Sequence, residues 1–153
     1  MKISDYRQFQ TADLQFCVRL FIDTFSRPPW QDQWKNEDHA SRYLRDFIEA
    51  PGFMGFVAEE AGLPVAFCIG NIRHWWQGDE FFVQEFFVIP SHQGKGIGQG
   101  LMDFTKKTLN ERGVRGLCLL TSRDSPAERF YRRNGLSEIP GMMFMAGGIK
   151  VEE

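Results

Sequence analysis

Hydrophobic residues recur with a helical period near the start of the chain. Apolar residues step by three or four positions from Leu14 to Phe25, with polar residues between them. This spacing is typical of an amphipathic helix that buries one face. Pro28 and Pro29 cannot continue that helix, because proline has no backbone N–H. A second helix is predicted over residues 36–49.

The middle of the chain changes to patterns that are typical of β-strands. An opening strand is predicted over residues 1–9, and further strands over residues 53–59, 65–75 and 81–89. The last of these, FFVQEFFVI, is apolar on both alternating faces, which indicates a central strand. Only Gln84 and Glu85 interrupt it.

Helices and strands also alternate in the second half of the chain. A glycine-rich stretch leads into a helix, a strand covers residues 114–121, and residues 136–151 are expected to form one or two closing strands. A last helix is predicted to begin at Ser125. There serine caps the helix, proline takes the first helical position and Glu128 completes a capping box.

Length and composition describe an ordinary globular protein. The 153 residues are 42% hydrophobic and 25% charged, which suits one domain over residues 1–153. No apolar run reaches the roughly 18 residues of a membrane span, and the N-terminus lacks the apolar stretch of a signal peptide. We therefore expect a cytoplasmic protein. The three cysteines form no CxxC pair and the three histidines are scattered, so we expect neither a metal site nor a disulfide scaffold.

Charge is divided unevenly along the chain. Residues 1–90 hold 8 basic and 13 acidic residues, whereas residues 91–153 hold 10 basic and 7 acidic ones. The acidic part suits a cationic ligand and the basic part suits a polyanionic one. The net charge of −2 argues against nucleic-acid binding by the protein as a whole.

Four glycines occupy alternate positions from Gly94 to Gly100, between the central strand and a helix. Glycine lets a backbone approach a ligand closely, and the first amides of a helix have no internal partners. The arrangement therefore predicts a phosphate site, with a tight turn that binds no ligand as the alternative. The dinucleotide pattern GxGxxG and the Walker A pattern are both absent, which argues against NAD and nucleoside triphosphates.

Two segments match the motifs of a known family. Residues 88–101 read VIPSHQGKGIGQGL, and residues 124–136 read DSPAERFYRRNGL. In this order and at this spacing they resemble the GNAT superfamily of N-acetyltransferases. Asp124 stands where the family usually has asparagine, and Leu136 stands where it usually has an aromatic residue.

The resemblance implies the GNAT fold, which is of the mixed α+β class. Its central, mostly antiparallel sheet has six to seven strands, splays between the fourth and fifth strands, and is flanked by about four helices. Acetyl-CoA is the implied cosubstrate, with no metal, and it binds in the splay. The implied cofactor-binding residues are Phe87, Val88, Ile89, Gln93, Gly94, Lys95, Gly96, Ile97, Gly98 and Asp124.

The resemblance also implies direct acetyl transfer to a primary amine. Glu85 is the candidate base, acting directly or through water, because burial in an apolar strand would raise its pKa toward a useful range. It could instead bind only the cationic acceptor, or serve the structure. Alternation predicts that it faces the same side as Val83, Phe87 and Ile89. Tyr131 is the candidate acid for the departing thiolate, with core packing as its alternative role.

Aromatic and acidic residues gather in the segments that shape the acceptor pocket in similar proteins. The candidate substrate-binding residues are Trp30, Trp34 and Trp75. Aromatic faces beside carboxylates suit an organic cation. The chain resembles small bacterial acetyltransferases of unassigned or aminoglycoside-like specificity, which favours a small polyamine or amino-sugar acceptor.

Two other functions stay open at this point. One is acetylation of protein lysines or N-termini, and the other is non-catalytic sensing of acyl-CoA. We expect no nucleic-acid or membrane partner. A homodimer is expected by analogy with similar proteins.

Overall fold

The structure is a computed structural model of the 153-residue chain and describes residues 5–150. Residues up to Leu120 form one compact unit, and residues from Thr121 onward form a second. The predicted opening strand is found from Asp5 onward, and its first four positions lie outside the described residues.

The first unit holds a five-stranded sheet with its helices. Its elements are β1 (Asp5–Gln8), η1 (Thr11–Asp13), α1 (Leu14–Phe25), α2 (Glu37–Ile48), β2 (Phe53–Glu60), β3 (Leu63–Trp75), β4 (Gly78–Val88), η2 (Pro90–His92), α3 (Ile97–Glu111) and β5 (Gly116–Leu119). The spatial order is β1-β2-β3-β4-β5, with β5 parallel to β4 and every other pair antiparallel. The mixed α+β class and the predicted order of these elements are confirmed.

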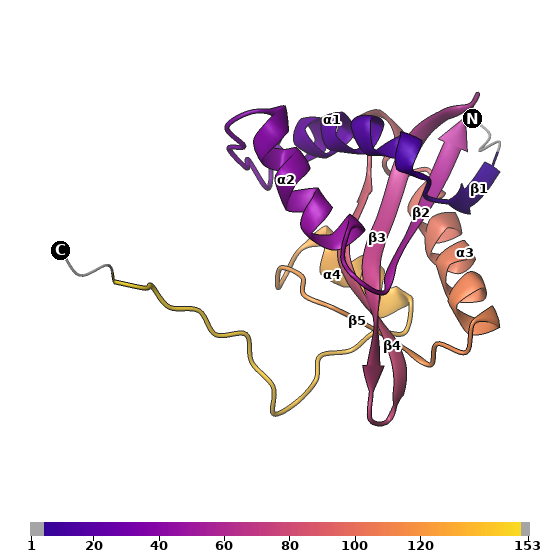
Figure 1. Cartoon of the computed structure of the whole chain (residues 1–153), viewed down its shortest axis with the longest axis vertical. Coiled ribbons are helices and arrows are strands. Elements are labelled where there is room, and N and C mark those ends of the chain that lie inside the picture. Colours follow the sequence, from indigo (N-terminus) through magenta and orange to yellow (C-terminus); the bar gives the residue numbers. More distant parts are fainter. Residues whose placement is uncertain (1–4, 151–153) are drawn as a thin grey trace. The chain divides into compact units, whose positions relative to one another are not determined.

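Different helices cover the two faces of the sheet (Figure 1). On one face, α1 and α2 bury Phe21 and Leu44 against Phe67 of β3. On the other face, α3 buries Leu101 against Phe81 of β4. Because both faces are covered, the central strands are apolar at successive positions.

A partly buried ion pair ties the first strand to the first helical turn. Arg7 of β1 donates to both carboxylate oxygens of Asp13 at 2.8 Å. Asp13 also accepts from the Gln10 amide at 2.7 Å, and Glu59 of β2 pairs with the same guanidinium. Burial acts to raise the pKa of Asp13, but these hydrogen bonds outweigh it and the pKa is lowered.

The predicted closing strands are not found. The second unit contains α4 (Pro126–Arg133), and residues 134–150 form no strand, so the expectation of six to seven strands is wrong. A strand forms only where a neighbouring strand satisfies its backbone hydrogen bonds. Here apolar side chains such as Met143 and Phe144 are instead about four-fifths exposed, at 80% and 77%. Residue 151, the last of the predicted range, lies outside the described residues.

Candidate functional site

Glu85 faces α1 and α2 because β4 contains a bulge. Two adjacent residues of β3 pair with Val83 and Glu85, so Gln84 is an extra residue on β4. A bulge of this kind shifts the alternation of side chains by one position. Val83 accordingly packs with the α3 core, whereas Phe87 packs with α1 and α2. Ile89, which follows the end of β4 at Val88, also packs with the α3 core. The prediction that Glu85 faces the same side as Val83 and Ile89 is wrong, and it holds for Phe87.

The Glu85 carboxylate is half-buried and has one described hydrogen-bond partner. The Tyr43 hydroxyl, from α2, donates to Glu85 Oε1 at 2.7 Å. Burial raises the pKa of Glu85 to about 7; the Tyr43 hydrogen bond lowers it and the nearby charge of Asp32 raises it. A carboxyl group with this pKa exchanges protons readily near neutrality, as a general base must.

Aromatic rings enclose this part of the sheet. The Tyr43 ring centroid lies 5.1 Å from that of Trp34 and 5.9 Å from that of Phe21. Phe21 in turn lies 5.9 Å from Phe87 of β4. Within residues 5–150, the buried Trp34 Nε1 has no hydrogen-bond partner. Because an unpaired buried donor costs free energy, an acceptor atom on a ligand would recover that cost.

The three candidate tryptophans lie at different distances from Glu85. Trp34 contacts Tyr43, which donates a hydrogen bond to Glu85. The ring centroid of Trp30 lies 4.9 Å from that of Phe25, which packs in the same core cluster as Trp34 and Tyr43. Trp75 ends β3 beside the β3–β4 turn and is half exposed, at 53%. It lies about 20 Å along the strand from the residue that pairs with Glu85. The fold therefore brings Trp34 to the tyrosine that bonds to Glu85, and it places Trp75 far along β3 from that site.

β5 accompanies β4 for only part of its length. The parallel pairing runs from Glu80 to Val83 and stops where β5 ends at Leu119. β4 continues to Val88 with β3 on its other side. The predicted splay between the fourth and fifth strands is confirmed. It leaves a strand edge to which an extended ligand can add.

Backbone amides are available in the turn before α3. Gly94 and Gly96 have φ angles of +75° and +84°, and a Cβ at either position would meet nothing within 4 Å. Across residues 5–150, the amides of Gly94, Lys95 and Gly96 donate to no backbone carbonyl. Ile97 and Gly98 follow in the first helical turn. Amides of this kind at a helix N-terminus favour an anion such as a phosphate group.

Gly100 serves packing. A Cβ at Gly100 would collide with the Tyr6 ring and hydroxyl, so glycine lets α3 lie close to β1. Gly94 and Gly96 therefore border open space, whereas Gly100 serves close packing.

Side chains around the turn hold it in place. Gln93 Nε2 donates to the Val88 carbonyl at 2.9 Å, and Lys95 Nζ donates to the Ser91 carbonyl at 3.3 Å. His92 Nε2 lies 2.5 Å from a Glu60 carboxylate oxygen. These contacts fasten the turn to the end of β4 and to β2, and the backbone amides remain as donors.

Asp124 and Tyr131 lie in the second unit. Asp124 has a φ of +59°, a left-handed conformation that aspartate and asparagine tolerate better than most residues. The Ser125 hydroxyl accepts from the Glu128 amide at 3.1 Å, so the predicted helix cap is confirmed. Tyr131 on α4 packs edge-to-face on Phe130 at 5.4 Å. Its role as an acid stays a prediction.

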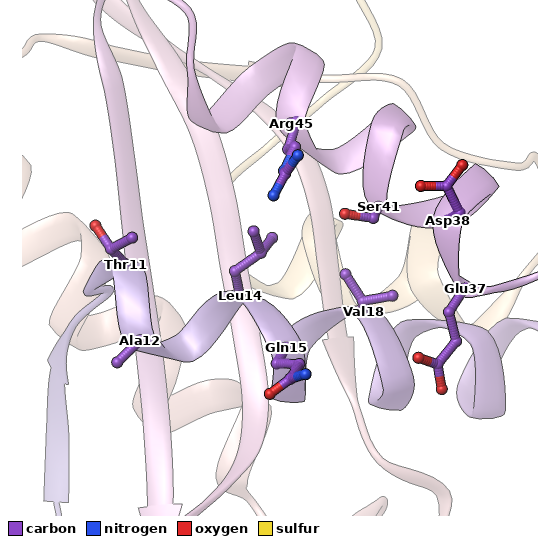
Figure 2. A pocket seen from close by; sticks show the side chains of 9 residues that line it. All are labelled: Thr11, Ala12, Leu14, Gln15, Val18, Glu37, Asp38, Ser41 and Arg45. Carbon is purple, nitrogen blue, oxygen red and sulfur yellow. The ribbon is translucent and has the colours of Figure 1, made fainter.

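Two open depressions flank α2. One, of about 410 Å³, is lined by Trp34, Lys35, His39, Arg42, Tyr43 and Asp46. The other, of about 480 Å³, lies between α2 and the start of α1 and carries polar groups including Gln15, Glu37 and Arg45 (Figure 2). The first adjoins the partner of Glu85, and the second contains none of the predicted site residues.

Two features are absent from residues 5–150. These residues contain no group of three or more His, Cys, Asp or Glu residues that could hold a metal ion. The same stretch has no helix with both the length and the apolarity to cross a membrane.

Sequence reasoning missed Tyr43. It borders the buried stripe of Ala40 and Leu44 on α2, which marks it as a boundary residue. Nothing local connects it with a carboxylate 42 positions later in the chain.

Known proteins resemble this chain in sequence. The model of the acetyltransferase (GNAT) family matches residues 15–136. The mycothiol acetyltransferase of Arthrobacter sp. strain FB24 is 29% identical over 117 residues, covering 74% of this chain and 36% of that protein. The enzyme of the same name from Thermomonospora curvata is 29% identical over 132 residues, covering 84% and 40%. The chain thus spans about two fifths of the length of these curated relatives.

Solved structures share its fold. A possible acetyltransferase from Clostridium difficile 630 has a TM-score of 0.80 at 14% identity, covering 97% of this chain and 100% of that one. AAC(6')-Iy, in complex with a bisubstrate analogue, has a TM-score of 0.73 at 19% identity, covering 95% and 98%. An aminoglycoside acetyltransferase from a soil metagenome, in complex with sisomicin, has 0.73 at 18%, covering 95% and 96%. Since the family model covers most of the chain and the fold agrees, the chain belongs to the GNAT family of acetyltransferases.

Proposed function

We propose that this chain transfers an acetyl group from acetyl-CoA to a primary amine of a small cationic molecule. The observation that carries the proposal is Glu85. It is a half-buried carboxylate with a pKa of about 7, and it lies on β4 where β5 has ended. Tyr43 bonds to it, and Trp34 packs on Tyr43. This combination suits the removal of a proton from an amine in a partly dry site.

The chain also offers what the cosubstrate needs. The open amides of the Gly94–Gly96 turn suit a diphosphate group. The edge of β4 beyond Val83 suits an extended amide-containing arm, which would pair as a strand does. The proposed binding set is Phe87, Val88, Ile89, Gln93, Gly94, Lys95, Gly96, Ile97, Gly98 and Asp124.

The proposed reaction moves two protons. An alkylammonium has a pKa near ~10, so it must lose a proton before its nitrogen can attack. Glu85 takes this proton, directly or through water. The nitrogen then attacks the thioester carbonyl carbon and the C–S bond breaks. The second nitrogen proton is lost as the amide forms, and Tyr131 supplies the proton that the thiolate takes up. The net products are the N-acetyl compound, CoA as a thiol, and one proton.

Charge and aromatic surface support a cationic acceptor. Asp32 lies close enough to raise the pKa of Glu85, so two carboxylates lie near the site, and the Trp34 ring packs on Tyr43, which bonds to Glu85. Trp30 and Trp75 complete the proposed acceptor-binding set, and Trp75 would contact only an acceptor that extends about 20 Å from the carboxylate. Structural neighbours named for aminoglycosides, and curated relatives named for mycothiol, favour a polyamine or an amino sugar over a protein lysine. We place the activity in the cytoplasm.

The test is a thiol-release assay with acetyl-CoA and a panel of acceptors. We expect turnover with polyamines or aminoglycosides and little with lysine peptides or N-terminal peptides. Strong acetyl-CoA binding, measured by calorimetry, together with no thiol release for any amine would favour the sensor. A chain that does not bind acetyl-CoA would refute both functions.

A further inference from the structure

We infer that Tyr43 is a positioning residue for Glu85, holding one carboxylate oxygen so that the other faces the acceptor amine. The inference rests on the proposed role of Glu85 as the base. The contact joins α2 to β4, two elements that are far apart in the sequence.

The tyrosine ring is itself held firmly. Its centroid lies 5.0 Å from Phe47, at an interplanar angle of 90°, and 5.1 Å from Trp34. Phe21 stacks on it at 5.9 Å and 25°. A ring packed between three aromatic neighbours directs its hydroxyl along one line. The position of Glu85 Oε1 is then determined by α2 as well as by β4.

The second carboxylate oxygen is the one left for substrate. Within residues 5–150, Tyr43 is the residue that donates a hydrogen bond to this carboxylate, and it does so at Oε1. Oε2 therefore keeps its capacity to accept a proton. The bulge at Gln84 turns the Glu85 side chain toward α2, and Tyr43 then holds its carboxylate there.

Tyr43 remains a donor throughout the working pH range. Burial raises the pKa of Tyr43, and the charge and hydrogen bond of Glu85 raise it further. The other titratable groups that act on this pair are Asp32, Asp46 and the Cys17 thiol from α1. Burial raises the pKa of Cys17 as well, so the thiol stays neutral. Near neutrality the Tyr43 hydroxyl and the Cys17 thiol therefore stay protonated, while Glu85, with a pKa of about 7, can change protonation.

The decisive variant is Tyr43→Phe, which keeps the ring and removes the hydroxyl. Because the hydrogen bond lowers the pKa of Glu85, its loss raises that pKa and moves the acidic limb of the kcat/KM profile to higher pH. We expect kcat/KM at pH 7 to fall about 10- to 100-fold and to recover in part at pH 9. The affinity for acetyl-CoA should be unchanged. A purely structural role would lower the whole profile without moving the limb.

Two controls make the result specific. Tyr6→Phe removes another partly buried phenol, in β1, and should leave the profile unchanged. In a Glu85→Gln background, Tyr43→Phe should cause no further loss, since the two residues act as one unit.

The outcomes separate this inference from the function beneath it. If the wild-type chain transfers acetyl groups and the limb of Tyr43→Phe does not move, the inference alone is refuted. If the losses of the two variants multiply, it is refuted as well. If the wild-type chain transfers no acetyl group to any amine, the proposed function fails. In that case the carboxyl ¹³C titration of Glu85 still tests the contact, and an unchanged pKa in Tyr43→Phe overturns it independently.

Discussion

Val83 and Glu85 lie on opposite faces of β4, although regular alternation would place them on the same face. Val83 belongs to the core beneath α3, and Glu85 reaches Tyr43 of α2. The extra residue, Gln84, reverses the alternation just where β5 stops pairing. One local irregularity therefore turns a carboxylate away from an apolar core and toward the proposed acceptor side.

Glu85→Gln should reduce activity and increase stability at alkaline pH. A carboxyl group whose pKa is raised from 4.5 to about 7 by folding holds its proton more tightly in the folded state. It therefore destabilises the protein progressively as pH rises between those values, by on the order of 3 kcal/mol at most. We expect a higher Tm than wild type at pH 8.5, little difference at pH 5, and a 100-fold or greater loss of kcat/KM. Equal Tm differences at both pH values would contradict the raised pKa.

Tyr131→Phe tests the proposed acid. Losing the phenolic proton should reduce kcat about 100-fold, because the thiolate then departs without a donor. The dissociation constant of acetyl-CoA should stay within a factor of about two. The Phe130→Leu variant, which changes the neighbouring ring that packs on Tyr131 at 5.4 Å, reports how much of any loss is packing. Full turnover in Tyr131→Phe would remove Tyr131 from the mechanism.

Gly96→Ala should weaken acetyl-CoA binding. A φ of +84° disfavours alanine by about 1–2 kcal/mol, and the added methyl group would occupy the open space of the turn. Gly113→Ala is the matched control, since Gly113 follows the same helix with a φ of +77° and equally open surroundings. Both variants should lose similar stability in urea, but only Gly96→Ala should lose at least 10-fold in affinity by calorimetry. Parallel losses of affinity would show that the turn does not contact the cosubstrate.

Trp34→Phe and Trp75→Ala should differ with the length of the acceptor. Trp34 contacts Tyr43 directly, so its replacement should raise KM several-fold for every amine that is turned over. Trp75 lies about 20 Å along β3 from Ile69, the residue that pairs with Glu85 across the sheet, so its loss should affect only long acceptors. Steady-state kinetics with a diamine and with an aminoglycoside would separate the two. A large KM effect of Trp75→Ala on the diamine would place the acceptor elsewhere.

Asp13→Ala should lower stability by about 2 kcal/mol at pH 7, because it leaves Arg7 short of a partner and the Gln10 amide uncapped. The pKa of Asp13 is lowered on folding, so its stabilising effect is present near neutrality and disappears as the pH falls through its folded-state pKa. Glu138→Ala breaks the exposed pair with Arg123 and should change stability far less, because solvent screens an exposed ion pair. Urea unfolding at pH 7 and pH 3 measures both. Equal losses in the two variants would contradict this ranking.

Local patterns in the sequence were enough to predict much of the fold. The apolar stripe of α1 and the Ser125 cap of α4 depend on residues that lie within one or two turns of each other. The glycine turn likewise follows from its own residues, because positive φ angles at Gly94 and Gly96 are a local demand. In each case the interacting groups are near neighbours in the chain, so their spacing alone carries the information.

The tertiary structure decided the features that depend on distant partners. The register of β3 on β4 places the bulge at Gln84, and that register is not visible in either strand alone. The packing of α2 brings Tyr43 to Glu85, and the closeness of Tyr6 explains Gly100. Residues 136–150 carry strand-like composition, yet no neighbouring strand pairs with them among the described residues. Pairing across the sheet and packing between elements are properties of two segments together, and a pattern read along one segment cannot contain them.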